Sequence, residues 1–162
     1  MDRRRYFRRT PIRSAVEGNA TDSETVAIVI LLVEVGGNVN AAIRQAAGFV
    51  ISTNLFMAAS LGKETTARFL IDQGVGIDET ADYPAPFQSR VSALHAAVRG
   101  DHFTIVKLLV EHGAFVNPTY YQRNKRDKEF TPRDDCYKNK GQGSETEKLL
   151  KAAGGFALHA YS

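Results

Sequence analysis

The sequence contains few residues that could carry out catalysis or hold a metal ion, and none of them has the spacing for it. Cys136 is the only cysteine, so an internal disulfide and a cysteine-rich zinc site are both excluded. His102 and His112 lie ten residues apart, at the two ends of an expected helix, and do not share a metal-binding face. Asp134 and Asp135 are adjacent and would project differently from a helix, so we expect them to stabilise its first turn. Sequence patterns of phosphate-binding loops, dinucleotide-binding turns and zinc proteases are absent. We therefore predict a protein that is not an enzyme and uses no cofactor and no metal.

Length and composition indicate a single soluble domain. The chain has 162 residues, of which 43% are hydrophobic and 24% charged. The longest apolar run, residues 26–33, is too short to cross a bilayer, so we expect no membrane span. A single cysteine is typical of a reducing compartment. We expect a cytoplasmic protein, with the nucleus and the cytosol of a host cell as alternatives.

The positive charge is concentrated near the N-terminus. Residues 1–13 contain six arginines and one aspartate, whereas the remaining 149 residues contain 15 basic and 17 acidic side chains. Residues 1–9 are interpreted as an arginine-rich leader that is dispensable for folding. The leader is a solvated segment, a nuclear-import-like signal or a patch for anionic surfaces. Because the rest of the chain is nearly neutral, the overall positive charge does not indicate nucleic-acid binding by the whole domain.

A glycine-ended apolar segment recurs four times, at residues 27–40, 67–78, 105–117 and 147–155. Each segment is apolar at helical spacing and reaches a glycine that can end a helix in the left-handed conformation. These glycines are Gly36, Gly74, Gly113 and Gly154. Each segment therefore predicts an apolar helix that stops at a defined residue.

A second, shorter helix is predicted before each of these segments. A hydroxyl residue that can cap a helix begins it, and a small residue follows five positions later. The caps are Thr10, Thr53, Ser92 and Thr131, and the small residues are Ala15, Ala58, Ala97 and Cys136. Small side chains let neighbouring helices approach closely, so we expect Cys136 to be buried and inert.

These features resemble the ankyrin repeat. Residues 92–117, SALHAAVRGDHFTIVKLLVEHGAFVN, are similar to its usual pattern, and TPIRSAVEGN at residue 10 and TPRDDC at residue 131 resemble its opening. The resemblance covers residues 10–154, divided at about 10–52, 53–91, 92–130 and 131–154, with 155–162 as a short tail. It implies an all-α solenoid of helix–turn–helix units with β-hairpin fingers. It also implies that His95 forms hydrogen bonds between repeats.

The spacing of the caps departs from the family. The caps are 43, 39 and 39 residues apart, against a usual repeat of about 33 residues. About five extra residues in the first repeat, residues 20–24, fall between its two helices. The other insertions fall in the fingers, at residues 41–52, 79–91 and 118–130. We expect the terminal repeats to act as caps, because an end unit has no further neighbour and should be polar outside.

Candidate binding residues lie on the fingers and on the first helices, which together form the concave side of a repeat stack. Aromatic residues on the fingers could be hot spots for a protein partner, or could pack the fingers together; both readings remain open. Basic residues on the third finger could meet an acidic partner or a nucleic-acid backbone, or form a solvated loop. The candidate partner-binding residues are Tyr83, Phe87, Arg90, Arg99, Tyr120, Tyr121, Arg123 and Lys138.

The expected function is protein–protein binding without chemistry, by a chain that is monomeric alone. One alternative is a small inhibitor, immunity or effector protein that blocks one specific partner. A second is nucleic-acid association through the arginine-rich leader and the third finger, although nucleic acid is the less favoured partner. The sequence does not identify the partner.

Overall fold

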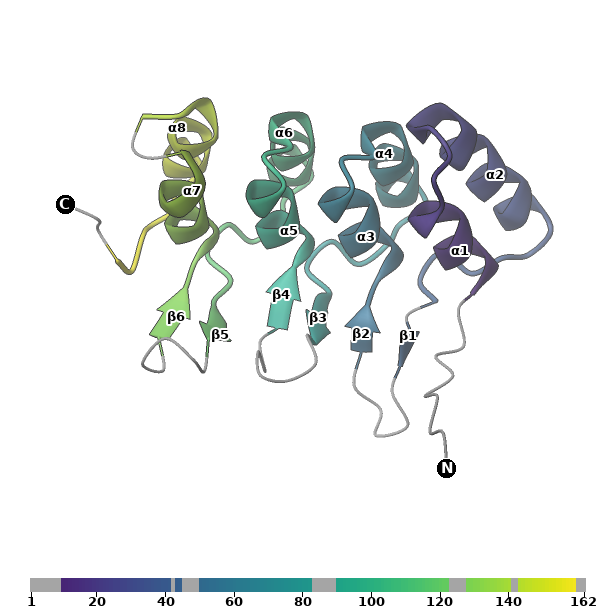
Figure 1. Ribbon diagram of the computed structural model, residues 1–162, viewed down its shortest axis with the longest axis horizontal. Coiled ribbons are helices and arrows are strands. Elements are labelled where there is room, and N and C mark those ends of the chain that lie inside the picture. Colours follow the sequence, from purple (N-terminus) through teal and green to yellow (C-terminus); the bar gives the residue numbers. More distant parts are fainter. Residues whose placement is uncertain are drawn as a thin grey trace.

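The computed structural model describes residues 10–41, 43–44, 50–82, 90–122, 128–140 and 143–159. Within them lie eight helices: α1 Pro11–Glu17, α2 Asp22–Glu34, α3 Asn54–Ser60, α4 Glu64–Asp72, α5 Ala93–Arg99, α6 Phe103–Glu111, α7 Pro132–Lys140 and α8 Glu145–Ala152. Consecutive helices form pairs that stand side by side in a row (Figure 1). This is the expected solenoid of helix–turn–helix units. The first helices α1, α3, α5 and α7, with the hairpins, form the side that we call the inner face, and α2, α4, α6 and α8 form the outer face.

The predicted helix ends are confirmed. The side chains of Thr10, Thr53, Ser92 and Thr131 each accept a hydrogen bond from a backbone N–H in the first turn of the helix that follows. Gly36, Gly74, Gly113 and Gly154 all have positive φ, between 78° and 91°. Only glycine adopts this conformation without strain, so these positions determine where each outer helix stops.

Three antiparallel hairpins join the units and project from one edge of the row (Figure 1). Their strands are β1 Ile43–Arg44 with β2 Val50–Ser52, β3 Thr80–Asp82 with β4 Arg90–Ser92, and β5 Tyr120–Gln122 with β6 Lys128–Phe130. The predicted fingers are therefore hairpins, and each returning strand leads directly into a helix cap. The tips of the fingers, residues 45–49, 83–89 and 123–127, lie outside the described residues.

Most of the extra residues of the first unit extend the outer helix: α2 has 13 residues, whereas α4 and α6 have nine each. The connection between its helices, residues 18–21, is only one residue longer than 61–63 and 100–102. Thr21 and Glu24 form a reciprocal capping box that starts α2 one turn early. The added turn places Asp22 against the start of α4, where its carboxylate accepts hydrogen bonds from the backbone N–H groups of Thr65 and Thr66. Partial burial raises the pKa of Asp22, but these hydrogen bonds outweigh it and leave the pKa below its ordinary value.

The core runs between the two layers of helices. Of the small residues that follow the caps, Ala58, Ala97 and Cys136 are at most 2% exposed and Ala15 is partly buried, as close packing of the helices requires. Leu94 and Leu108 are each 1% exposed and contribute to the same core. Burial of this apolar surface is the dominant favourable contribution to folding.

The tail after the last glycine returns to the beginning of α7. The Asp134 carboxylate accepts hydrogen bonds from the backbone N–H groups of Leu158 and His159, and the Thr131 hydroxyl donates to the Phe156 carbonyl. The side chains of Phe156 and Leu158 remain 47% and 44% exposed. Hydrogen bonds from side chains to the tail backbone hold this segment, together with an edge-on contact between the His159 and Phe130 rings. In the described part of the chain, no helix combines the length and apolar character needed to cross a membrane.

Candidate functional site

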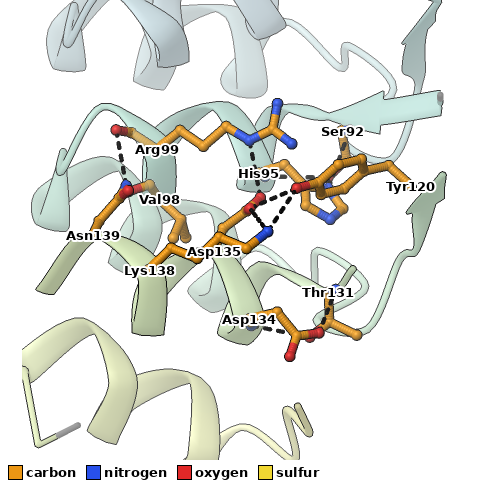
Figure 2. A network of polar contacts seen from close by, with 10 residues as sticks. All are labelled: Ser92, His95, Val98, Arg99, Tyr120, Thr131, Asp134, Asp135, Lys138 and Asn139. Carbon is orange, nitrogen blue, oxygen red and sulfur yellow. Dashed lines mark hydrogen bonds and ion pairs between the residues drawn. The ribbon is translucent and has the colours of Figure 1, made fainter. Parts of the chain in front are cut away.

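The structure brings three of the predicted partner-binding residues together. Arg99, Tyr120 and Lys138 gather where α5, β5 and α7 meet (Figure 2). For Arg90 and Tyr121 the structure describes the strand backbone but not the side chain. Tyr83, Phe87 and Arg123 lie outside the described residues.

Arg99, at the end of α5, is held in one orientation by two partners. Its Nε–H donates to Asp135 Oδ2 at 2.9 Å, and its guanidinium carbon lies 4.2 Å from the centroid of the Tyr120 ring. Burial alone would lower the pKa of Arg99, but the Asp135 carboxylate raises it above its ordinary value. The side chain is still 38% exposed. A fixed, fully charged guanidinium therefore faces solvent at the inner face.

The ring of Tyr120 packs against the Arg99 guanidinium and is not exposed on the finger. Only 5% of Tyr120 is exposed, and its ring packs edge-on against His95 and stacks on Phe130. Its hydroxyl donates to Asp135 Oδ1 at 2.7 Å. Burial and the neighbouring carboxylate both raise the pKa of Tyr120. Of the two readings left open for the finger aromatics, the exposed hot spot does not apply to Tyr120, because the strand turns its ring into the core.

Asp135 is the centre of the cluster, and the sequence reasoning assigned it only to a helix start. Its two carboxylate oxygens accept hydrogen bonds from Arg99 and Tyr120, and Lys138 Nζ lies 3.6 Å from Oδ1. The side chain is only 4% exposed. One signal was available: the equivalent positions of the other units, four residues after each cap, carry no acid. They are Ser14, Met57 and Ala96.

Lys138 occupies the position in α7 that Arg99 occupies in α5, seven residues after the cap. Its Nζ lies 3.2 Å from the centroid of the Phe130 ring, which is a close cation–π contact. The next residue, Asn139, donates from its side-chain amide to the backbone carbonyls of Val98 and Arg99 at the end of α5. Together these contacts join the third unit to the fourth.

His95 lies behind the cluster and is fully buried. Its Nδ1 is 3.0 Å from Ser92 Oγ and accepts the Ser92 backbone N–H at 3.4 Å. Burial, with a smaller contribution from the Arg99 charge, lowers the pKa of His95 to about 3, although the carbonyls of Pro118 and Phe130 act in the opposite direction. His95 is therefore neutral near pH 7. Its hydrogen bonds are to Ser92 of its own unit, and its ring meets Tyr120 of the third finger edge-on.

The other residues that were considered for catalysis or metal binding have structural roles. Asp134 accepts the N–H and the hydroxyl of Thr131, so it stabilises the helix start as expected. Cys136 is 2% exposed and lies 3.2 Å from Ser144 Oγ, and burial raises the pKa of its thiol. No group of three or more side chains that could ligate a metal occurs among the residues that the structure describes. Among the described residues, this cluster presents a fixed charge to solvent and does not bring a nucleophile next to a base.

The other inner-face positions equivalent to Arg99 are acidic or neutral. Glu17 of α1 forms an ion pair with Arg13 at 2.7 Å, and the Ser60 hydroxyl donates to the Met57 carbonyl within α3. Leu61, which ends α3, is 47% exposed. The inner face therefore changes from apolar and neutral at α3 to cationic at α5 and α7.

Comparisons with known proteins agree with this architecture. A family model described as ankyrin repeats, in three copies, matches residues 19–120. The chain is also similar to alpha-latrocrustotoxin-Lt1a of Latrodectus tredecimguttatus, with 32% identity over 108 residues. That alignment covers 67% of this chain and 6% of the toxin, so the chain corresponds to a small part of that much longer protein.

Proposed function

Because the chain belongs to the ankyrin-repeat family, we propose that it binds its partner through the inner face and the hairpin fingers. Ankyrin repeats indicate a protein–protein interaction module. The position of the site within the solenoid and the chemistry of the partner are the parts that we add. The observation that carries them is the orientation of Arg99 by Asp135 and Tyr120.

An arginine held in this way loses little conformational entropy when a partner binds. The ion pair and the stacking contact already restrict the side chain, so less ordering cost falls on association. Arginine is also a residue type that is enriched at the centres of protein interfaces. The inner face at α5 and α7 is thus suited to a partner with a carboxylate that can reach Arg99.

The fingers extend the same surface. β5 and β6 belong to the hairpin that buries Tyr120 and Phe130 beneath Arg99 and Lys138. We propose that the finger residues Tyr83, Phe87, Arg90, Tyr121 and Arg123 contact the partner beside these two cations. Steric blocking of one partner, as in an inhibitor, is a narrower form of this proposal and uses the same surface. We propose binding without catalysis, because the buried His95 and Cys136 cannot reach a substrate.

Affinity capture with matched variants tests the position of the site. Arg99→Ala and Lys107→Ala each remove one cation that pairs with one carboxylate, Arg99 on the inner face and Lys107 on the outer face. Each variant is immobilised beside the unaltered protein, and the captured proteins are quantified by mass spectrometry. We expect Lys107→Ala to retain the partner and Arg99→Ala to lose it by tenfold or more, about 1.4 kcal/mol. Retention by Arg99→Ala with loss by Lys107→Ala would place the site on the outer face instead.

A further inference from the structure

The outer helix of the first unit has a second apolar face. Ile28, Leu31 and Val35 lie three and four residues apart, on one side of α2 and at its C-terminal cap, and they are 42%, 62% and 83% exposed. The opposite side of the helix carries the buried Val29 and packs on the rest of the solenoid. A helix that is apolar on both sides is typical of an element covered from both sides. The prediction that the first unit is a cap with a polar outer surface is therefore wrong.

The position of this stripe within the repeat explains its composition. Counted back from the helix-ending glycine, Ile28 corresponds to Thr66 in α4 and to Ile105 in α6, and both of these are fully buried. Thr66 is covered by α2 itself, since its hydroxyl and its backbone N–H both donate to Asp22 Oδ1. Leu31 likewise corresponds to Leu108, which is 1% exposed. Ile28 and Leu31 thus occupy positions that are buried in α6, whereas Gln73 and His112, at the position of Val35, are exposed.

An apolar groove continues the stripe towards the start of α1. Val35 and Leu32 line it on one side and Thr10, Pro11 and Ile12 on the other, and its volume is about 400 Å³. The stripe and the groove together form one surface, which we call the first-unit face. Its charges are acidic: α2 contributes Glu24 and Glu34, since Asp22 faces α4, and α2 has no basic residue.

Residues 1–9 of the same chain have the complementary chemistry. They contain five arginines and one aspartate, and the arginines flank Tyr6 and Phe7. They join the described chain at Thr10, which itself lines the groove. An extended chain covers about 3.3 Å per residue, so Phe7 can lie roughly 10 Å from Thr10, well within the approximately 20 Å length of α2.

We propose that residues 1–9 dock on the first-unit face, with Tyr6 and Phe7 on the apolar stripe and in the groove, and the arginines beside Glu24 and Glu34. The covalent connection at Thr10 makes this an intramolecular contact of high effective concentration. The alternative occupant is a second copy of the chain that pairs α2 with α2. That pairing would bring acidic helices together with no basic residue between them, whereas the arginine-rich segment supplies the opposite charge. The proposal is independent of partner binding at the inner face.

Nuclear magnetic resonance of the full chain with labelled Ile, Leu and Val methyl groups tests this contact. We expect intramolecular Overhauser contacts from the ring protons of Tyr6 and Phe7 to the methyl groups of Leu31 and Val35. The double substitution Tyr6→Ala with Phe7→Ala should shift those methyl resonances and lower the melting temperature by roughly 2–4 °C, the shift that about 1 kcal/mol produces in a chain of this size. Phe156→Ala, which removes an aromatic side chain that is 47% exposed at the other end of the solenoid, should leave the resonances of Leu31 and Val35 unchanged.

A second substitution separates docking from a general effect on stability. Val35→Gln installs the residue type of Gln73, which occupies the equivalent position in α4, and Val35 is exposed enough for the variant to fold. In this background the Tyr6→Ala and Phe7→Ala pair should lower the melting temperature by less than half as much as in the unaltered chain. An absence of the Overhauser contacts would overturn the proposal. So would contacts seen only between differently labelled copies and increasing with concentration, because they would show that a second copy covers the face.

Discussion

The Nε–H of Arg99 in the third unit donates to a carboxylate oxygen of Asp135 in the fourth, across 2.9 Å. The second oxygen of the same carboxylate accepts the Tyr120 hydroxyl from the finger between them. One buried acid therefore fixes the orientation of an inner-face cation and joins two units and a finger. The proposed binding surface and the stacking of the solenoid therefore both depend on this residue.

Loss of Asp135 should destabilise the chain more than loss of an exposed acid. Asp135→Ala leaves the buried Tyr120 hydroxyl without its acceptor, and an unsatisfied buried group costs about 1–3 kcal/mol. Glu111→Ala is the matched control, since Glu111 pairs with Lys107 at 3.8 Å with both side chains more than half exposed. Exposed pairs contribute about 0–1 kcal/mol. Urea unfolding of both variants checks this difference, and equal midpoints would contradict the role of Asp135.

Acidification should destabilise the fold through His95. Its pKa is about 3 in the folded chain and about 6.5 when unfolded, so between these values the unfolded state binds the extra proton. Stability is complete above pH 6.5 and falls as the pH decreases towards 3. From pH 7 to pH 5 this group alone should remove about 2 kcal/mol from the free energy of unfolding.

The control for this pH dependence is a second histidine. His95→Asn should abolish the His95 component, whereas His112→Gln, at an exposed helix end, should retain it. Urea titrations at pH 7, 6 and 5 measure the free energies. If the His95→Asn variant loses as much stability on acidification as the unaltered chain, His95 is not the buried group responsible.

The thiol of Cys136 should resist alkylation in the folded protein. It is 2% exposed and burial raises its pKa, so little thiolate is available to react. Iodoacetamide should modify it slowly under native conditions and rapidly in urea. Thr104→Cys in a Cys136→Ser background places a cysteine at an exposed outer-face position and should react rapidly in the native state. Equal native rates would show that Cys136 is accessible.

Truncation of the core leucines should have a large effect. Leu94→Ala and Leu108→Ala should each lower the free energy of unfolding by about 2–5 kcal/mol, because both side chains are 1% exposed. Leu61→Ala should lower it by less than about 1 kcal/mol, since Leu61 is 47% exposed. Chemical denaturation measures all three. A loss below about 1 kcal/mol at Leu94 or Leu108 would mean that the helices do not stack in this register.

The local features of the fold could be predicted from the sequence because they depend on neighbouring residues. Thr53 must cap the residue three positions later, and Gly74 must end the helix that immediately precedes it. The role of Asp135 could not be predicted in this way, because its partner Arg99 is 36 residues away and becomes adjacent only when the units stack. The burial of Tyr120 depends on which side of β5 faces the core, and a three-residue strand shows too little alternation to reveal it.

The first unit also has features that could not be predicted from neighbouring residues alone. Its extra residues were expected in a loop, but the Thr21 and Glu24 capping box allowed them to lengthen α2. The exposure of Leu31 follows from stacking, because the same repeat position is buried in α6. Repeat register predicts which positions face a neighbour, but not whether a neighbour is present at each one.

Site-specific photo-crosslinking tests the central claim most directly. A photoreactive amino acid is placed at Ser60, on the inner face of α3, or at Lys107, on the outer face of α6, and each protein is irradiated in its native cells. We expect one partner protein to crosslink to the Ser60 position and not to the Lys107 position, with the crosslink reduced at least tenfold by Arg99→Ala. Crosslinking of the partner through Lys107 alone, unaffected by Arg99→Ala, would contradict binding at the inner face.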